Sequence, residues 1–115
     1  MFIRRVGAVL AGIVVLFMGE AGYAQNAAIE RGMKVYVDQK CSACHAVAGK
    51  GNAKGALDDA GSKLSADEIR AWLVNPVEMN KKMKSERKPP MRAFASLPKE
   101  DLDAVVAYVS SLKKK

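Results

Sequence analysis

The chain has 115 residues, of which 19 are basic and 12 acidic, giving a formal charge of +7 at neutral pH. This length supports one small domain and leaves no room for a second. An excess of basic residues favours binding to nucleic acid, to an anionic membrane or to an acidic protein surface. The aromatic residues do not interleave with the basic ones as they do in nucleic-acid modules, which favours an acidic protein as partner over nucleic acid.

The first 24 residues have the organisation of a secretory signal peptide. Arg4 and Arg5 precede an apolar stretch over residues 6–18, and the small residues Gly22 and Ala24 follow it at the positions that a signal peptidase reads. The apolar stretch is shorter than the roughly 18 residues of a membrane-spanning helix, although an uncleaved anchor stays open as an alternative. We expect residues 1–24 to be removed and residues 25–115 to form an exported, periplasmic domain with no stable membrane span.

Residues 27–40 form the first predicted helix of that domain. Ile29, Met33, Tyr36 and Val37 recur at helical spacing. Gly32 lies one turn before Tyr36 on the same face, where a glycine costs about 1 kcal/mol relative to alanine. A close approach of another helix is a packing reason for keeping it.

The pentapeptide Cys41-Ser42-Ala43-Cys44-His45 follows directly. Two thiols three residues apart, with an imidazole immediately after the second, form the arrangement that attaches a c-type haem. On a helical turn the two cysteines share a face, so each can reach one vinyl group of the same macrocycle. His45 then supplies the proximal axial ligand of the iron.

Three other interpretations of this pentapeptide fit less well. A thioredoxin-like redox pair requires a βαβ unit, of which the sequence shows no pattern. A tetrahedral zinc site requires a fourth ligand, yet Cys41, Cys44 and His45 are the only cysteines and histidine in the chain. A disulfide across so short a span would constrain little.

Residues 46–63 are expected to form a loop, because glycines at 49, 51, 55 and 61 break any regular pattern and let the backbone pass close to the haem. Ser65 and Glu68 then form a capping box that opens a helix ending before Pro76. Trp72 in that helix either donates its indole N–H to a haem propionate or lies at the wet edge of the core.

A basic stretch over residues 78–88 leads into Pro89-Pro90-Met91. Methionine opposite histidine is a common axial pair in electron carriers. Met91 is the favoured distal ligand because the prolines give it a rigid, non-helical backbone. Met79 and Met83 stay open as alternatives, although they lie in or near helical segments, whereas Met33 is too close to the pentapeptide.

The last predicted helix is amphipathic. Its apolar residues recur at helical intervals from Leu102 to Leu112, with Tyr108 beside them. Acidic residues at its start and lysines at 113–115 suit the helix dipole.

Taken together, these features resemble the small bacterial class I cytochromes c. In that family an N-terminal helix with a glycine and an aromatic residue crosses an aromatic-bearing C-terminal helix, and Gly32, Tyr36 and Tyr108 resemble these residues. The stretch from Met91 to Phe94 resembles the family's distal-methionine segment.

The resemblance implies an all-α fold of three to five helices wrapped around one covalent haem c, with crossing terminal helices. It implies Cys41 and Cys44 as thioether attachments and His45 and Met91 as iron ligands.

Two positions depart from the family pattern. Tyr36 stands one residue farther from the first cysteine than the usual aromatic residue, which could shift the helix crossing. Ala56 replaces the proline whose carbonyl commonly accepts the proximal imidazole N–H, so the carbonyl of Ala56 is the expected acceptor.

The expected function is that of a monomeric, periplasmic, monohaem electron carrier rather than an enzyme. Basic residues around an exposed haem edge would steer it onto an acidic partner; these are Lys81, Lys82, Lys84, Arg87, Lys88 and Arg92. The alternatives are a gas- or peroxide-reactive or sensing haem protein, and a haem subunit of a larger oxidoreductase complex.

Overall fold

The computed structural model describes residues 18–114. The two arginines and nearly all of the apolar stretch of the predicted signal peptide lie outside this range. The chain is mostly helical, as predicted, and the described elements are α1 (Met18–Asp38), the 3₁₀ turn η1 (Cys41–Ala43), β1 (Ala46–Val47), β2 (Lys50–Gly51), the 3₁₀ turn η2 (Ala53–Gly55), α2 (Ala60–Lys63), α3 (Ala66–Val74), α4 (Pro76–Met83) and α5 (Lys99–Ser110). Helix α1 covers the predicted helix from residue 27 to residue 38, two residues short of the predicted end, and runs without a break past Ala24, the expected last residue of the signal peptide.

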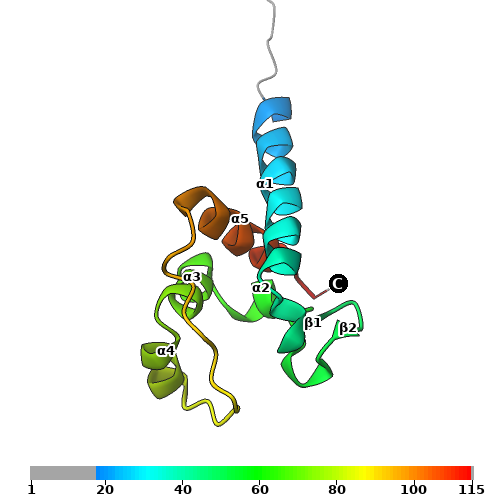
Figure 1. The fold of residues 1–115 in the computed structure, drawn as a ribbon. Helices are drawn as coiled ribbons and strands as arrows, with labels where there is room; N and C mark the ends of the chain where they lie inside the picture. The colour runs from blue at the N-terminus through cyan, green and yellow to red at the C-terminus, as the bar shows by residue number, and fades with distance from the viewer. Residues whose placement is uncertain (1–17, 115) are drawn as a thin grey trace, which may run out of the picture.

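Helices α1 and α5 cross at the centre of the fold (Figure 1). At the crossing, a Cβ on Gly32 would overlap the backbone carbonyl of Ala104 and lie 2.6 Å from the Cβ of Tyr108. Tyr36, one turn on, packs edge-to-face against Tyr108, with ring centroids 5.7 Å apart. The predicted helix crossing is therefore confirmed, and the displaced position of Tyr36 does not prevent it.

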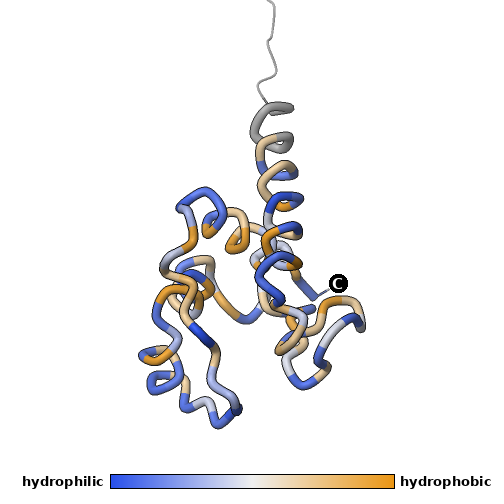
Figure 2. Tube along the Cα trace, viewed as in Figure 1, coloured by the Kyte–Doolittle hydropathy of each residue, from blue (hydrophilic) through white to orange (hydrophobic). Residues whose placement is uncertain are grey.

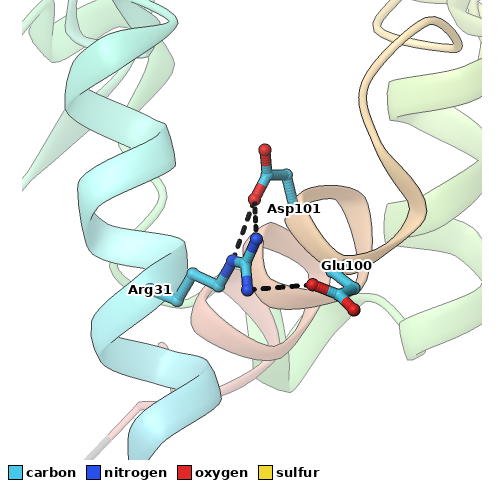
Figure 3. Close-up of polar contacts among 3 residues, drawn as sticks. All are labelled: Arg31, Glu100 and Asp101. Carbon is cyan, nitrogen blue, oxygen red and sulfur yellow. Dashed lines mark hydrogen bonds and ion pairs between the residues drawn. The ribbon is translucent and has the colours of Figure 1, made fainter.

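Ion pairs at the edge of this crossing involve the first turns of α5. Arg31 of α1 reaches Glu100 at 3.1 Å and Asp101 at 2.8 Å (Figure 3). Arg70 of α3 pairs with Asp103 at 2.7 Å. Because every one of these side chains except that of Asp101 is at least 40% exposed, the pairs contribute only modestly to stability.

The hydrophobic core lies where α1, α3 and α5 meet. Hydrophobic residues recur along these helices between hydrophilic ones (Figure 2). Ile69 and Leu73 of α3 pack with Val105, Val106 and Val109 of α5, each no more than 7% exposed. This apolar cluster also forms one side of the site described below.

The region between the pentapeptide and α3 is more regular than the predicted loop. Strands β1 and β2 pair antiparallel with Ala46 opposite Gly51, and the turn between them passes through Ala48 and Gly49, both at positive φ. Strands of two residues are too short to show alternation in a sequence, so the loop prediction missed them. Helix α2 packs Gly61 against the carbonyl of Ser110, so this glycine serves the contact with α5.

Helix α3 begins at the predicted capping box. Ser65 Oγ accepts from the amide of Glu68 at 3.1 Å, and Glu68 Oε1 accepts from the amide of Ser65 at 3.0 Å. The helix ends at Val74 as predicted, and Pro76 then occupies the first turn of α4, where its missing N–H costs nothing.

Residues 84–98, which we call the strap, connect α4 to α5 without a helix or strand. The strap runs from the end of α4 back past α3 to the start of α5 (Figure 1, yellow to orange). The amide of Phe94 donates to the carbonyl of Leu73 at 2.6 Å and fixes its second half to α3. Within residues 18–114 we find no helix long and apolar enough to cross a membrane.

Candidate cofactor-binding site

A cavity of about 490 Å³ lies between the pentapeptide, α3, α5 and the strap. Its size falls in the range of about 300–1,000 Å³ typical of cofactor pockets. Its lining is mostly apolar and includes every residue that the sequence analysis assigned to the haem site; the principal lining residues are Tyr36, Cys41, Cys44, His45, Leu57, Leu64, Ile69, Trp72, Leu73, Met91, Phe94, Val105 and Val109.

The two cysteines enter the cavity from a single tight turn. Lys40 adopts a left-handed conformation, with φ of 57°, and redirects the chain from α1 into η1. The amides of Cys44 and His45 both donate to the carbonyl of Cys41, at 3.1 and 2.9 Å. Both thiols are free and both residues line the cavity, as attachment to one macrocycle requires. Burial raises the pKa of the Cys41 thiol, and the positive charge of Arg92 opposes that shift.

The imidazole of His45 is held by the backbone of η2. Its Nδ1 lies 2.9 Å from the carbonyl oxygen of Gly55. Because a carbonyl only accepts, Nδ1 carries the proton and Nε2 keeps its lone pair. Burial lowers the pKa of His45 from 6.5, which favours the neutral, metal-binding form. This arrangement leaves Nε2 of His45 as the nitrogen whose lone pair can bind a metal.

The expectation that Ala56 would provide this acceptor is wrong. Gly55 ends the 3₁₀ turn η2, and that turn presents the Gly55 carbonyl to the imidazole. Ala56 is instead engaged in a parallel bridge with Ala46. The acceptor is therefore displaced by one residue from the expected position.

The methionines differ clearly in position. Met91 is half-buried, packs against the core and lines the cavity. Met79 is buried outside the cavity lining, while Met33 and Met83 are about half exposed. Among the methionines whose side chains the structure describes, only Met91 faces this cavity. Trp72 is also half-buried and lines the cavity. This position is compatible with a hydrogen bond from its indole N–H to a haem propionate and with a place at the solvent-exposed edge of the core.

The basic residues fall into two groups. Lys81, Lys82 and Lys84 are exposed at the end of α4, as expected of surface charges. Arg87 and Arg92 instead line the cavity and bond to backbone carbonyls, Arg87 to that of Cys44 and Arg92 to that of Gln39 at 2.9 Å. These contacts could not be predicted from the sequence, because the partners lie 43 and 53 residues away and no local signal marks them.

The residues around the cavity fit a covalent haem. Two free thiols on one turn, an imidazole with a free Nε2 and a thioether share an apolar lining. Thiols attach the vinyl groups, whereas imidazole and thioether are established haem-iron ligands. Apolar side chains suit the faces of a porphyrin and keep water from it.

Comparison with known proteins agrees with this chemistry. The family model described as cytochrome c matches residues 29–113. Cytochrome c oxidase subunit 2 of Alkalihalophilus pseudofirmus is 28% identical over 92 residues, covering 72% of this chain and 25% of that protein. The chain therefore spans about a quarter of the length of that relative. No solved structure matches the chain at a significant level.

Proposed function

This chain belongs to the cytochrome c family, and from that premise we propose that it is a one-electron carrier with a single covalent haem c. The observation that carries the proposal is the joint presence of Cys41, Cys44, His45 and Met91 in the lining of one apolar cavity. When bound, the haem iron supplies the redox chemistry, and a thioether ligand favours its reduced form.

Each residue of the site has a distinct role in this proposal. Cys41 and Cys44 would hold the macrocycle through thioether bonds, and His45 would bind the iron through Nε2. The Gly55 carbonyl fixes the tautomer and orientation of His45 and makes the imidazole a stronger donor. Met91 would hold the iron through its thioether as a second protein ligand beside His45, which suits a carrier rather than a protein that binds substrate at the iron.

The distal ligand is tested by optical spectroscopy of the natively matured protein. We expect the oxidised protein to show the near-infrared charge-transfer band of methionine ligation, and Met91→Ala to abolish it. Met83→Leu is the matched control, because Met83 is exposed and lies outside the cavity lining. A wild-type protein that lacks the band and binds carbon monoxide rapidly when reduced would instead support a gas-reactive or sensing haem protein.

We also propose that residues 1–24 are removed on export and that residues 25–115 act as a monomer in the periplasm. Three features support export: the basic pair Arg4 and Arg5, the short apolar stretch over residues 6–18, and the small residues Gly22 and Ala24. Export also agrees with the haem-attachment pentapeptide, because haem is joined to such pentapeptides outside the cytoplasmic membrane. Intact-mass measurement of the native protein should give residues 25–115 plus one haem. A mass that includes residues 1–24 would support a retained anchor.

An acidic redox protein is the proposed partner. Lys81, Lys82, Lys84 and Lys88 are exposed near the cavity and would steer the encounter electrostatically. The rate of electron transfer to the physiological partner should fall as ionic strength rises. A rate indifferent to salt would remove the support for this docking surface.

A second candidate is the haem module of a larger oxidoreductase complex. The similarity to part of an oxidase subunit favours it specifically. Isolation at native abundance separates the two: a carrier purifies alone, whereas a module co-purifies stoichiometrically with larger subunits.

A further inference from the structure

Two arginines flank Met91 in the strap, and the first of them bonds to the Cys41–His45 turn. Arg87 donates from Nη2 to the carbonyl of Cys44. Its guanidinium also lies directly over Gly55, where any Cβ would overlap it. Arg87 therefore contacts both the turn that carries the thiols and the residue that orients His45.

The second arginine bonds to the end of α1. Arg92 donates from Nη2 to the carbonyl of Gln39 at 2.9 Å, and its guanidinium lies 4.7 Å from the centre of the Phe94 ring. Gln39 follows the last residue of α1, a position where backbone carbonyls lack a partner within the helix. Arg92 thus ties the residue next to Met91 to the segment leading into Cys41.

The first half of the strap has little else to hold it. Across the described chain, no backbone–backbone hydrogen bond involves residues 86–93, and two of these residues are prolines without an N–H. Apart from Arg87 and Met91, which are half-buried, these residues are exposed. A segment with exposed backbone and few hydrogen bonds opens at low free-energy cost, so side-chain contacts decide how often it does.

We propose that Arg87 and Arg92 form a two-point clasp that keeps the strap closed over the cavity and thereby controls how readily Met91 is displaced from the iron. The inference rests on the proposed ligation by Met91 and adds a regulation of that site. An external ligand competes only when the strap opens, so its apparent affinity follows the fraction of open strap. The clasp residues are positioning residues, because they act through the segment that carries Met91.

The test uses the haem-loaded protein with Arg87→Leu, Arg92→Leu and the double variant. Imidazole is titrated into the oxidised protein while loss of the methionine charge-transfer band is followed. We expect each single variant to bind imidazole about tenfold more tightly, and the double variant more tightly still, because a hydrogen bond from a charged group is lost each time. Hydrogen exchange of the peptide covering residues 84–95 should accelerate in parallel.

Arg70→Leu is the matched control, since it removes an arginine that pairs with Asp103 and lies outside the cavity lining. It should change neither imidazole affinity nor exchange in the strap. If a leucine variant loses its helical circular dichroism, Arg87→Gln and Arg92→Gln replace it, with the same expected direction. Clasp variants that match the wild type in both measurements overturn the proposal.

The two measurements separate failure of the clasp from failure of the proposed ligation. If the wild type lacks the methionine band, the ligation by Met91 fails. Exchange in the strap then still tests the clasp, because it reports opening of the backbone whatever occupies the iron. Unchanged exchange in the double variant refutes the clasp in that case as well.

Discussion

Substituting Gly32 by alanine tests whether the crossing of α1 and α5 needs a residue without a side chain. A new Cβ would overlap the carbonyl of Ala104 and lie 2.6 Å from the Cβ of Tyr108, whereas carbon atoms in contact prefer about 3.5–4.0 Å. The helices must therefore separate by about 1 Å at the point where they are closest. The obstacle includes backbone, which cannot rotate out of the way.

The net effect follows from two opposed contributions. Alanine is about 1 kcal/mol better than glycine within a helix. Overpacking of this kind costs about 1–3 kcal/mol, and a backbone obstacle places the cost at the upper end. We expect a net loss of about 2 kcal/mol, equivalent to a fall of about 8–16 °C in the melting temperature of a domain this small.

Guanidinium denaturation of the haem-loaded protein, followed by far-ultraviolet circular dichroism, measures the difference. Val37→Ala is the control, because Val37 lies on the same helix and is 69% exposed. Its free energy of unfolding should stay within about 0.5 kcal/mol of the wild type. A Gly32→Ala protein as stable as the wild type, or more so, would refute the packing argument.

Three further substitutions probe the fold and the proximal side of the site. Glu68→Gln should make the free energy of unfolding depend less on pH in the acid range. The hydrogen bonds with Ser65 lower the pKa of Glu68 from 4.5 in the folded protein. The stabilisation by the Glu68 carboxylate is therefore complete above pH 4.5 and is lost as pH falls through the folded-state pKa. Denaturation midpoints between about pH 3 and pH 7 measure this, and an unchanged slope would contradict it. Arg31→Gln should lower the melting temperature slightly at low salt and scarcely at about 1 M salt, because its ion pairs are exposed and screened; an equal loss at both would argue against an electrostatic origin. Gly55→Ala should raise the reduction potential of the haem, because the new Cβ displaces the Gly55 carbonyl, whose hydrogen bond makes His45 a stronger electron donor to the iron. Potentiometric titration tests this. An unaltered potential would show that the hydrogen bond between His45 and Gly55 does not influence the haem.

The features that the sequence predicted well are local. The capping box joins Ser65 and Glu68, three residues apart, and the periodicity of the last helix is complete within residues 102–112. The pentapeptide carries its chemistry in five consecutive residues, so the haem site could be inferred before any fold was known. Gly32 is an intermediate case, since the anomaly of a glycine within a helix was visible in the residues, whereas its partner helix came only from the family resemblance.

The features that the sequence missed depend on where distant segments meet. The carbonyl of Gly55, rather than that of Ala56, accepts the hydrogen bond from Nδ1–H of His45 because a 3₁₀ turn of three residues ends there, and turns so short leave no periodic signal. The choice of Met91 over Met79 could be argued from the prolines, but its position in the cavity lining follows from the path of the strap.

The sequence by itself thus determined the helices α1, α3 and α5, the haem-attachment turn and the family resemblance, because hydrophobic periodicity, helix caps and motif spacing act over a few residues. Only the tertiary structure decided which carbonyl orients His45 and which arginines hold the strap. Those hydrogen bonds span 10, 43 and 53 residues, and their formation depends on the path of the folded chain rather than on any pattern near either partner.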